Sequence, residues 1–321
     1  MGFLFKEFSK LRISNGLSQE ELADRSGVSA SRIKNYECGR RRANEEDVKK
    51  MCEVFNVRFN DYYKKDTVII PFLSNKGGST KTTSCANLGF TLANTFGMRI
   101  LLIDTDLQQN LTQHYDMSID DEKNFYVAFN NKQPLINHIR DTSYPNIQIV
   151  TSHDAISMLE GELVSMELRE FRFRQILESV ISDGVYDYIL IDCNPSLNLL
   201  NRSILYASNR IIIPLEPSSF GLRGVQYVMN FVSGVKENYP ELEIMGVLVN
   251  KFDNRKRVPK DVIELVTDIF GDRSLLFKTK IPVDTCIEQC QMMGEPLGVS
   301  FEKSRANLAF IKVAEEVIKR G

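Results

Sequence analysis

The chain has 321 residues, of which 43% are hydrophobic and 26% are charged, and its formal net charge is −2. These values are typical of a soluble protein of about two domains, and they argue against a uniformly basic nucleic-acid binder. Because there is no apolar run near 18 residues and no signal-peptide pattern, we expect a cytoplasmic protein.

The N-terminal segment differs in charge from the rest of the chain, with a net charge of +3 against −5. Helical spacing runs over residues 4–14, and Ser18 with Glu21 forms a capping box that starts a second helix. Ser29 is placed to cap a third helix over residues 30–37. We therefore expect a small all-α domain over residues 1–66 and a second domain over residues 67–321.

The second and third helices have the spacing of a helix-turn-helix, because small Ala23 and apolar Val28 and Ile33 allow the two helices to cross closely. The run Leu-Ser-Gln-Glu-Glu-Leu-Ala, with the later Ser-Gly-Val-Ser and Tyr-Glu-x-Gly-Arg-Arg, closely resembles the Cro/XRE repressor domains. In that arrangement the later helix lies in the major groove of DNA.

The resemblance implies DNA contacts of two kinds. Base edges are read by the third helix, where Arg can pair with guanine and Asn with adenine, and phosphates are held at the helix starts and in the following loop. The implied DNA-binding residues are Gln19, Ser29, Ala30, Ser31, Arg32, Asn35, Arg40, Arg41 and Arg42. The alternative is a helical bundle for protein contacts whose arginines are merely solvated.

The second segment opens with an apolar run, residues 67–73, that leads into a loop of small residues and a helix start. The loop reads Lys76-Gly77-Gly78-Ser79-Thr80-Lys81-Thr82-Thr83. Backbone N–H groups and the positive end of the helix favour a triphosphate there, with Lys81 at the β/γ-phosphates and the Thr82 hydroxyl as a Mg²⁺ ligand. The two glycine positions of the strict Walker pattern hold Asn75 and Thr80, so an ordinary surface turn is the competing interpretation.

Apolar strands and amphipathic helices alternate beyond this loop, which predicts an α/β domain with a mainly parallel sheet covered on both faces. The expected strands cover residues 67–73, 99–103, 147–150, 186–191, 210–215 and 244–249.

Carboxylates follow two of these strands, at the edge where parallel sheets bind ligands. Asp104-Thr105-Asp106 follows one strand, and Asp192 follows another as a Walker B-like residue that can hold Mg²⁺ or cap a helix. Together with Lys-Gly-Gly-x-x-Lys-Thr-Thr, these motifs resemble the deviant Walker A P-loop NTPases of the ParA/MinD superfamily, and of ParA partition ATPases in particular.

The resemblance implies a role for each matching residue. Lys76 is the signature lysine that reaches the ATP of a dimer partner, Lys81 contacts the phosphates, and Asp106 orients the attacking water. Thr82, Asp104 and Asp192 would support the metal, and Asn250 with Pro282 would frame the adenine. The implied cofactors are ATP/ADP and Mg²⁺. Leu107 and Gln109 replace the family's Pro and Gly, which leaves the flexibility of their loop open.

Other charged or metal-binding residue types give weaker signals. Lys251, Arg255 and Lys256 form a basic run that is either a solvated face or part of a nonspecific DNA surface, with Lys303 and Arg305 as additions. Cys286 and Cys290 lie one helical turn apart without further ligand spacing, so reduced thiols are expected. His114, His138 and His153 are assigned no function.

These observations favour a DNA (plasmid or mobile-element) partition ATPase. It would form a homodimer when it binds ATP, and the dimer would coat nonspecific DNA near the nucleoid without a membrane. A ParB-like partner would stimulate hydrolysis, and the N-terminal domain would repress the protein's own operon. The alternative is a nucleotide-sensing transcriptional repressor without a segregation role. A MinD-like positioning ATPase needs a membrane helix, and a reductase like the nitrogenase iron protein needs cluster cysteines.

Overall fold

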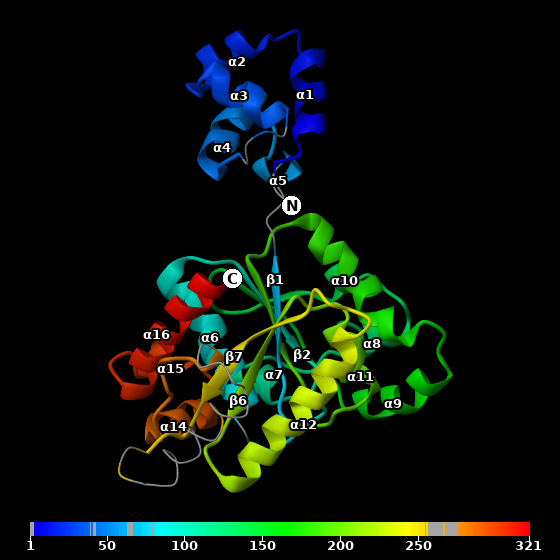
Figure 1. Ribbon diagram of the computed structural model, residues 1–321, viewed down its shortest axis with the longest axis vertical. Helices are drawn as coiled ribbons and strands as arrows, with labels where there is room; N and C mark the ends of the chain where they lie inside the picture. The colour runs from blue at the N-terminus through cyan, green and yellow to red at the C-terminus, as the bar shows by residue number, and fades with distance from the viewer. Residues whose placement is uncertain are drawn as a thin grey trace. The chain divides into compact units, whose positions relative to one another are not determined.

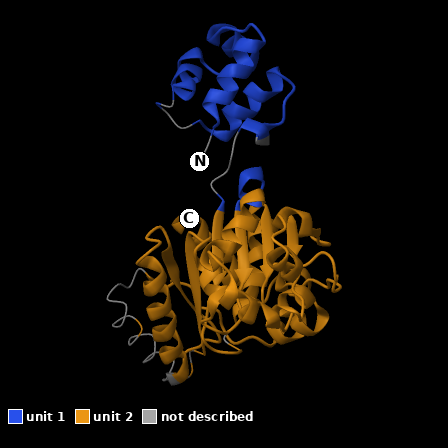
Figure 2. Ribbon diagram, turned by 90° about the vertical axis from the view of Figure 1, so that its right-hand side faces the viewer, with its two compact units in different colours: residues 1–67, 180–187 blue, residues 68–179, 188–321 orange. Residues whose placement is uncertain are grey.

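A computed structural model describes residues 3–38, 40, 43–62, 67–78, 80–253, 255, 266 and 275–321. The chain divides into two compact units, coloured separately in Figure 2. The first comprises Met1–Thr67 and Val180–Asp187, and the second comprises Val68–Ser179 and Tyr188–Gly321. The short segment from the middle of the chain is an addition to the N-terminal unit that no sequence pattern indicates.

The N-terminal unit is helical, as its sequence predicts. Its helices are α1 (Phe5–Ser14), α2 (Gln19–Ser26), α3 (Ala30–Glu37), α4 (Glu45–Val54) and α5 (Phe59–Tyr62). The expected capping box is present, because Ser18 accepts from the Glu21 backbone N–H while the Glu21 side chain accepts from the Ser18 N–H. Ser29 is the N-cap residue of α3, as expected, but within the described residues its side chain makes no capping hydrogen bond.

Helices α1, α2 and α3 are joined by one polar network as well as by apolar packing. Arg12 on α1 donates from Nε and Nη2 to the two carboxylate oxygens of Glu37, at 2.7 and 2.8 Å, and from Nη1 to the Leu17 carbonyl. Gln19 on α2 donates to the same carboxylate at 2.7 Å. The helix-turn-helix packs over buried Val28 and Ile33, as expected.

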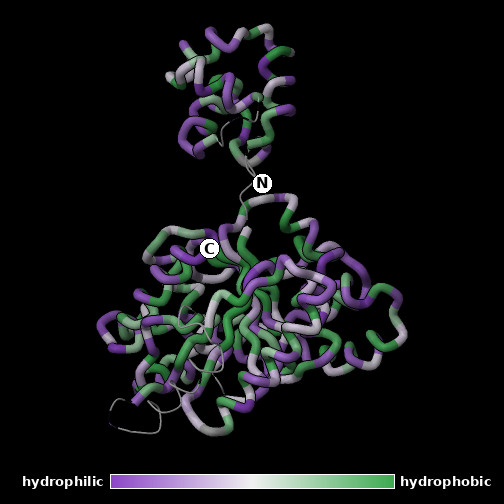
Figure 3. The backbone as a smooth tube through the Cα atoms, in the orientation of Figure 1, coloured by the Kyte–Doolittle hydropathy of each residue, from purple (hydrophilic) through white to green (hydrophobic). Residues whose placement is uncertain are grey.

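The second unit is built on a seven-stranded sheet of order β3-β4-β2-β5-β1-β6-β7. All neighbouring strands are parallel except the β3–β4 pair. The strands are β1 (Val68–Phe72), β2 (Ile100–Asp104), β3 (Arg140–Asp141), β4 (Ile147–Val150), β5 (Tyr188–Asp192), β6 (Arg210–Leu215) and β7 (Glu243–Val249). Figure 3 shows the central strands as the most apolar part of this unit, which accords with a sheet covered on both faces.

Right-handed crossovers place the helices in two layers. From β1 the chain crosses to β2 in one direction along the sheet, and from β5 it crosses to β6 in the other direction. The helices of these two connections, α6 and α11, therefore cover opposite faces of the sheet (Figure 1). The helices and 3₁₀ turns are α6 (Lys81–Phe96), α7 (Asn110–His114), α8 (Phe125–Asn130), η1 (Leu135–His138), α9 (Ile156–Ser165), η2 (Arg169–Phe171), α10 (Arg172–Asp183), α11 (Leu199–Leu205), α12 (Ser219–Lys236), α14 (Thr285–Met293), α15 (Leu297–Ser300) and α16 (Arg305–Arg320).

Helix α6 lies close to the sheet because one of its residues, Gly89, has no side chain. A Cβ atom on Gly89 would lie 2.9 Å from a Leu102 methyl group of β2. This close approach fixes the N-terminus of α6, and with it the preceding loop, relative to the strand ends. Among the helices in the described ranges, none combines enough length and apolar character to cross a membrane.

Candidate functional site

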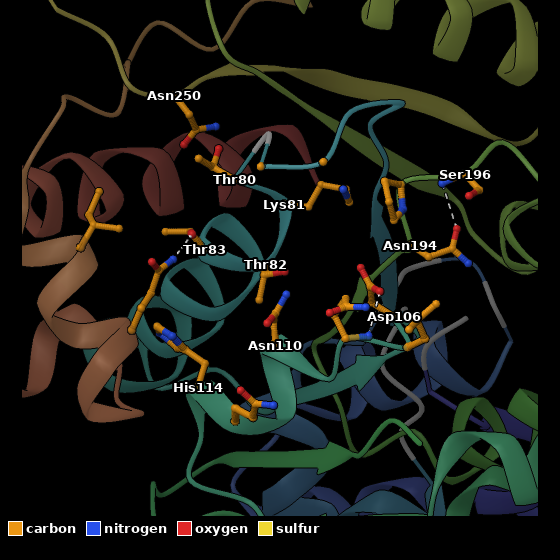
Figure 4. Close-up of a pocket in the computed structure, with 18 of the residues that line it drawn as sticks. Thr80, Lys81, Thr82, Thr83, Asp106, Asn110, His114, Asn194, Ser196 and Asn250 are labelled. Carbon is orange, nitrogen blue, oxygen red and sulfur yellow. Dashed lines mark hydrogen bonds between the residues drawn. The ribbon is translucent and has the colours of Figure 1, made fainter. Parts of the chain in front are cut away.

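A cavity of about 940 Å³ opens at the carboxyl ends of the strands of the second unit. Its walls come from the loop after β1, the segment after β2, the loop after β5 and the chain around α14. Figure 4 shows Lys81, Asp106 and Asn194 gathered at one end of the cavity, with Thr83 and Asn250 toward the other. Of the residues predicted to hold nucleotide, the following line it: Gly77, Gly78, Thr80, Lys81, Thr82, Thr83, Asn250 and Pro282.

The loop after β1 has the backbone of a phosphate-binding loop. Gly78 and Thr80 both have positive φ, +71° and +67°, which turns the chain sharply before α6 begins at Lys81. The Lys81 side chain is only 6% exposed, and its Nζ donates to the Lys76 carbonyl at 3.4 Å. A buried ammonium beside a helix N-terminus favours a bound anion. Ser79 lies outside the described residues.

Thr82 and Asp192 meet at the floor of the cavity. The Thr82 hydroxyl donates to Asp192 Oδ2 at 2.6 Å, while Asp192 Oδ1 is buried and has no hydrogen-bond partner among the described residues. Burial, with the nearby Asp104 charge as a second cause, raises the pKa of Asp192 well above its usual range. A hydroxyl and a carboxylate with an unpartnered oxygen fit the ligand preference of Mg²⁺, directly or through water.

Asp104 and Asp106 have different environments although they are two residues apart. Asp104 is fully buried and accepts from the Thr112 hydroxyl, the Thr112 N–H and the Asp106 N–H, and burial raises its pKa to about 6. Asp106 lines the cavity, with Oδ1 accepting from the Gln108 N–H at 3.1 Å. Asp104 thus fixes the loop that presents Asp106. Its contacts to this loop make its link to a metal more indirect than the metal role that we predicted for it.

The far end of the cavity has the polar groups expected around a base. Asn250 is 1% exposed; its Oδ1 accepts from the Ser84 hydroxyl at 3.3 Å, and its Nδ2 donates to the Leu248 carbonyl. Gln291 of α14 donates to the Thr83 hydroxyl at 2.8 Å. No sequence signal indicated Gln291, because it comes from a helix more than 200 positions away.

Two lysines have side-chain contacts that their motifs do not indicate. Lys251, predicted for a DNA surface, is exposed and lines the nucleotide cavity, and its Nζ donates to the Gly78 carbonyl at 3.4 Å. Lys76 belongs to the phosphate-binding loop, yet its Nζ pairs with Glu216 Oε2 at 3.1 Å. Its side chain therefore points toward the β6–α12 connection and lines a separate, smaller cavity.

The third helix of the N-terminal unit presents the predicted base-reading residues. Ser29, Ser31, Arg32 and Arg40 are exposed, and Ala30 and Asn35 are half-buried. Arg32 is 48% exposed and forms an ion pair with Asp47 at 3.3 Å. The Gln19 amide donates to Glu37, so the phosphate contact predicted for it competes with a bond inside the unit. Arg41 and Arg42 lie outside the described residues.

A second hollow, of about 850 Å³, is basic. We call it the basic hollow and define it by the cations on its wall, which are Arg255, Lys278, Lys280, Arg305 and Lys312. Arg255 is 88% exposed and pairs with Asp253, while Lys280 lies 4.5 Å from the centre of the Phe252 ring. The sequence pattern found Arg255 and Arg305, but the three lysines come together only through the fold. Lys256 lies outside the described residues.

Comparisons with known proteins match both units. Residues 9–62 match a helix-turn-helix family and residues 67–244 match a family described as an AAA domain. The chromosome partitioning protein ParA of Caulobacter vibrioides NA1000 is 31% identical over 254 residues, which cover 78% of this chain and 94% of that protein. The sporulation initiation inhibitor protein Soj of Bacillus subtilis 168 is 34% identical over 255 residues, or 79% and 99% of the two chains.

The fold of the second unit also has solved counterparts. The cobyrinic acid a,c-diamide synthase of Mycobacterium smegmatis, crystallised with an ATP analogue and magnesium, superposes with a TM-score of 0.67 at 24% identity. The superposition covers 79% of this chain and 94% of that one. At this identity the similarity shows the fold alone.

Proposed function

The chain belongs to the ParA family of P-loop ATPases, and we propose that it couples ATP hydrolysis to the partition of DNA, with operator binding by its helix-turn-helix unit. The relatives named for chromosome partitioning match 78% of this chain and most of their own length. A separate family match over residues 9–62 covers the helix-turn-helix unit, which supports a DNA-reading role of its own for that unit.

The main observation in support of an ATPase site is the Thr82–Asp192 hydrogen bond, which leaves Asp192 Oδ1 without a partner among the described residues. A buried carboxylate oxygen without a partner costs free energy unless a cation or water satisfies it. We assign Mg²⁺ to this position, held by Thr82 and Asp192. When bound, the ion neutralises charge on the β- and γ-phosphates. Asp104 is assigned to the support of the Asp106 loop.

The remaining roles follow from position along the cavity. Lys81 holds the phosphates, and Asp106, whose carboxylate faces the cavity, orients the attacking water. Asn250 and Pro282 frame the adenine, with Gln291 fixing Thr83 beside it. Lys76 reaches the nucleotide of a second subunit, so that ATP closes a homodimer.

Two DNA surfaces serve two functions in this proposal. Helix α3 finds an operator through Arg32 and Asn35, and the basic hollow binds phosphates without sequence preference. A ParB-like partner accelerates hydrolysis and so releases the dimer from nonspecific DNA near the nucleoid.

The chemical roles are tested with Lys81→Ala and Asp106→Ala. We expect Lys81→Ala to lose hydrolysis and to bind ATP more weakly, because the point charge at the phosphates is gone. Asp106→Ala should bind Mg-ATP, dimerise and stay on DNA without turnover, because a water-orienting group acts in the chemical step. Wild-type hydrolysis in Lys81→Ala would refute the phosphate assignment, and failure of Asp106→Ala to bind Mg-ATP would move that residue to a structural role.

A nucleotide-sensing repressor remains the second candidate, because the helix-turn-helix unit alone supports it. Partition requires repeated turnover, whereas a purely regulatory role can work with negligible turnover. The two are separated by measuring ATP hydrolysis with plasmid DNA and with a ParB-like protein encoded beside this gene. Stimulation by both supports partition, and slow turnover that neither changes supports the repressor.

A further inference from the structure

We propose that Glu216 is a positioning residue that holds Lys76 outside the nucleotide cavity of its own subunit and must release it before two subunits close over ATP. The inference rests on the proposed function, in which Lys76 reaches the nucleotide of the partner. It adds a second step, the opening of an ion pair, between nucleotide binding and dimer formation.

The placement of Lys76 shows that the loop presents its two lysines to different places. Lys81 lines the nucleotide cavity, whereas Lys76 is not among the described residues that line it. Lys76 instead lines a small cavity together with Ser74, Leu215 and Glu216, and its Nζ lies 3.1 Å from Glu216 Oε2. Its backbone carbonyl meanwhile accepts from Lys81 Nζ.

The backbone that carries Glu216 is fixed by the start of α12. The Glu216 carbonyl accepts from the Ser218 N–H at 2.8 Å, and the Ser218 hydroxyl caps α12 through the Gly221 N–H. A Cβ atom on Gly221 would lie 2.1 Å from the Glu216 carbonyl oxygen, so the first turn of α12 packs directly on it. Glu216 therefore offers its carboxylate from one defined place, and Lys76 is the flexible member of the pair.

The ion pair is strong enough to bias Lys76 and weak enough to open. Its side chains are 35% and 29% exposed, so water screens the attraction, and such a pair shifts an equilibrium by roughly two- to fivefold. An ammonium group has three N–H donors, but at Glu216 the Lys76 side chain lies in the small cavity and not in the nucleotide cavity, so we infer that it must leave Glu216 to reach a phosphate of the partner. Each subunit must break its own pair, so the effect on dimerisation is roughly the square, or about four- to twenty-fivefold.

The test measures the protein concentration at which ATP produces the dimer, by light scattering of the full chain. Glu216→Gln keeps the shape of the side chain and removes its charge, and we expect its dimer to form at roughly four- to twenty-fivefold lower concentration than wild type. Glu216→Asp retains the charge on a shorter side chain and should fall between the two. The KM for ATP at saturating protein should not change, because Glu216 acts on Lys76 and not on the bound nucleotide.

Glu243→Gln is the matched control. It removes the partner of Arg210, an ion pair of 2.9 Å on β6 and β7 that does not involve the phosphate-binding loop, and should dimerise as wild type does. If wild type dimerises with ATP and both Glu216 variants need the same concentration as wild type, the proposal is overturned. If wild type stays monomeric with ATP, the proposed dimer itself is refuted, together with this inference.

Discussion

Thr80 has a backbone conformation that suits glycine. Its φ of +67° and ψ of +23° lie in the left-handed region, where a residue with a Cβ pays about 1–2 kcal/mol. Strain of this kind persists where the surrounding structure requires it, and it gathers at binding loops. At Thr80 the turn must bring Lys81 to the start of α6, so the strain belongs to the phosphate-binding loop.

We predict that Thr80→Gly raises the free energy of unfolding by roughly 0.5–1 kcal/mol, since relief of the left-handed strain exceeds the backbone entropy cost of glycine. Urea titration of the nucleotide-free chain measures it. Thr95→Gly is the matched control, because Thr95 is an exposed residue within α6, the helix that Thr80 precedes, and the change there should destabilise. A loss of stability in Thr80→Gly equal to that of Thr95→Gly would contradict the assignment of strain.

His114 is a second residue with an unusual environment. Its side chain lines the nucleotide cavity at 4% exposure, Nε2 has no hydrogen-bond partner among the described residues, and burial lowers its pKa to about 4. The unfolded chain takes up a proton near pH 6.5 while the folded chain does not. Stability from this residue is therefore lost as pH falls from about 6.5 to 4.

The pH dependence of unfolding should report this directly. His114→Leu removes the titrating group, so between pH 7 and pH 5 the variant should lose about 2 kcal/mol less stability than wild type. Urea titrations of both proteins at several pH values give the slope of the free energy of unfolding against pH. The two slopes can be compared even if the variant differs from wild type in absolute stability. Parallel curves for the two proteins would show that His114 is protonated in the folded state as easily as in the unfolded one.

At the scale of elements, the positions of the strands were predictable and their arrangement was not. Each expected strand is present within two residues of its predicted bounds, because buried parallel strands are continuous apolar runs. Strand β3 was missed, since Arg140–Asp141 has neither length nor alternation. The strand order and the approach of α14 to the cavity depend on tertiary packing, so Gln291 could not be placed from the sequence.

The same limit explains the residues around the candidate site. The structure brings Lys81, Thr82, Asp106 and Asp192, which the motifs had named, to one cavity or its floor, because parallel strand ends share one edge. A motif fixes a backbone position and leaves the direction of a long flexible side chain open. Lys76 accordingly points to Glu216, and Lys251 donates to the Gly78 carbonyl of the phosphate-binding loop.

Helix α3 is the element on which operator recognition should depend. Arg32→Ala and Asn35→Ala each remove a base contact worth about 1–3 kcal/mol of discrimination, so operator affinity should fall while binding to random duplex persists. Titrations of both duplexes measure this. Arg25→Ala on α2 is the control, since it removes an exposed charge outside α3. Equal losses on both duplexes in the Arg32 variant would leave the N-terminal unit as the DNA surface for both activities and favour the repressor.

At the scale of the whole molecule, a chain of net charge −2 nevertheless has five cations against two aspartates, Asp253 and Asp284, around one hollow. Such clustering binds phosphates whatever the total charge, because the attraction is screened beyond about 8–10 Å at physiological salt. Nonspecific DNA affinity should therefore depend on the basic hollow and much less on cations elsewhere on the second unit.

Replacing Lys278, Lys280 and Lys312 together by Gln should lower affinity for random duplex and reduce its dependence on log salt by about 0.9 for each lost phosphate contact. Operator affinity at α3 should change far less. The control is the triple change of three exposed lysines outside the hollow, Lys123, Lys132 and Lys236, to Gln. If both triple variants lose affinity and salt dependence equally, net charge alone governs the binding.

The order of the strands has a consequence for the synthesis of the chain. Strand β1 lies between β5 and β6, and the Thr82–Asp192 bond joins residues 110 positions apart. A chain growing on the ribosome therefore carries the phosphate-binding loop long before the carboxylate and the two flanking strands exist. Pairing between strands so far apart in the sequence is slow, so the phosphate-binding loop reaches its final contacts only after β5 and β6 have paired with β1. Nucleotide can stabilise the completed sheet, but it cannot guide the first half of the chain toward it.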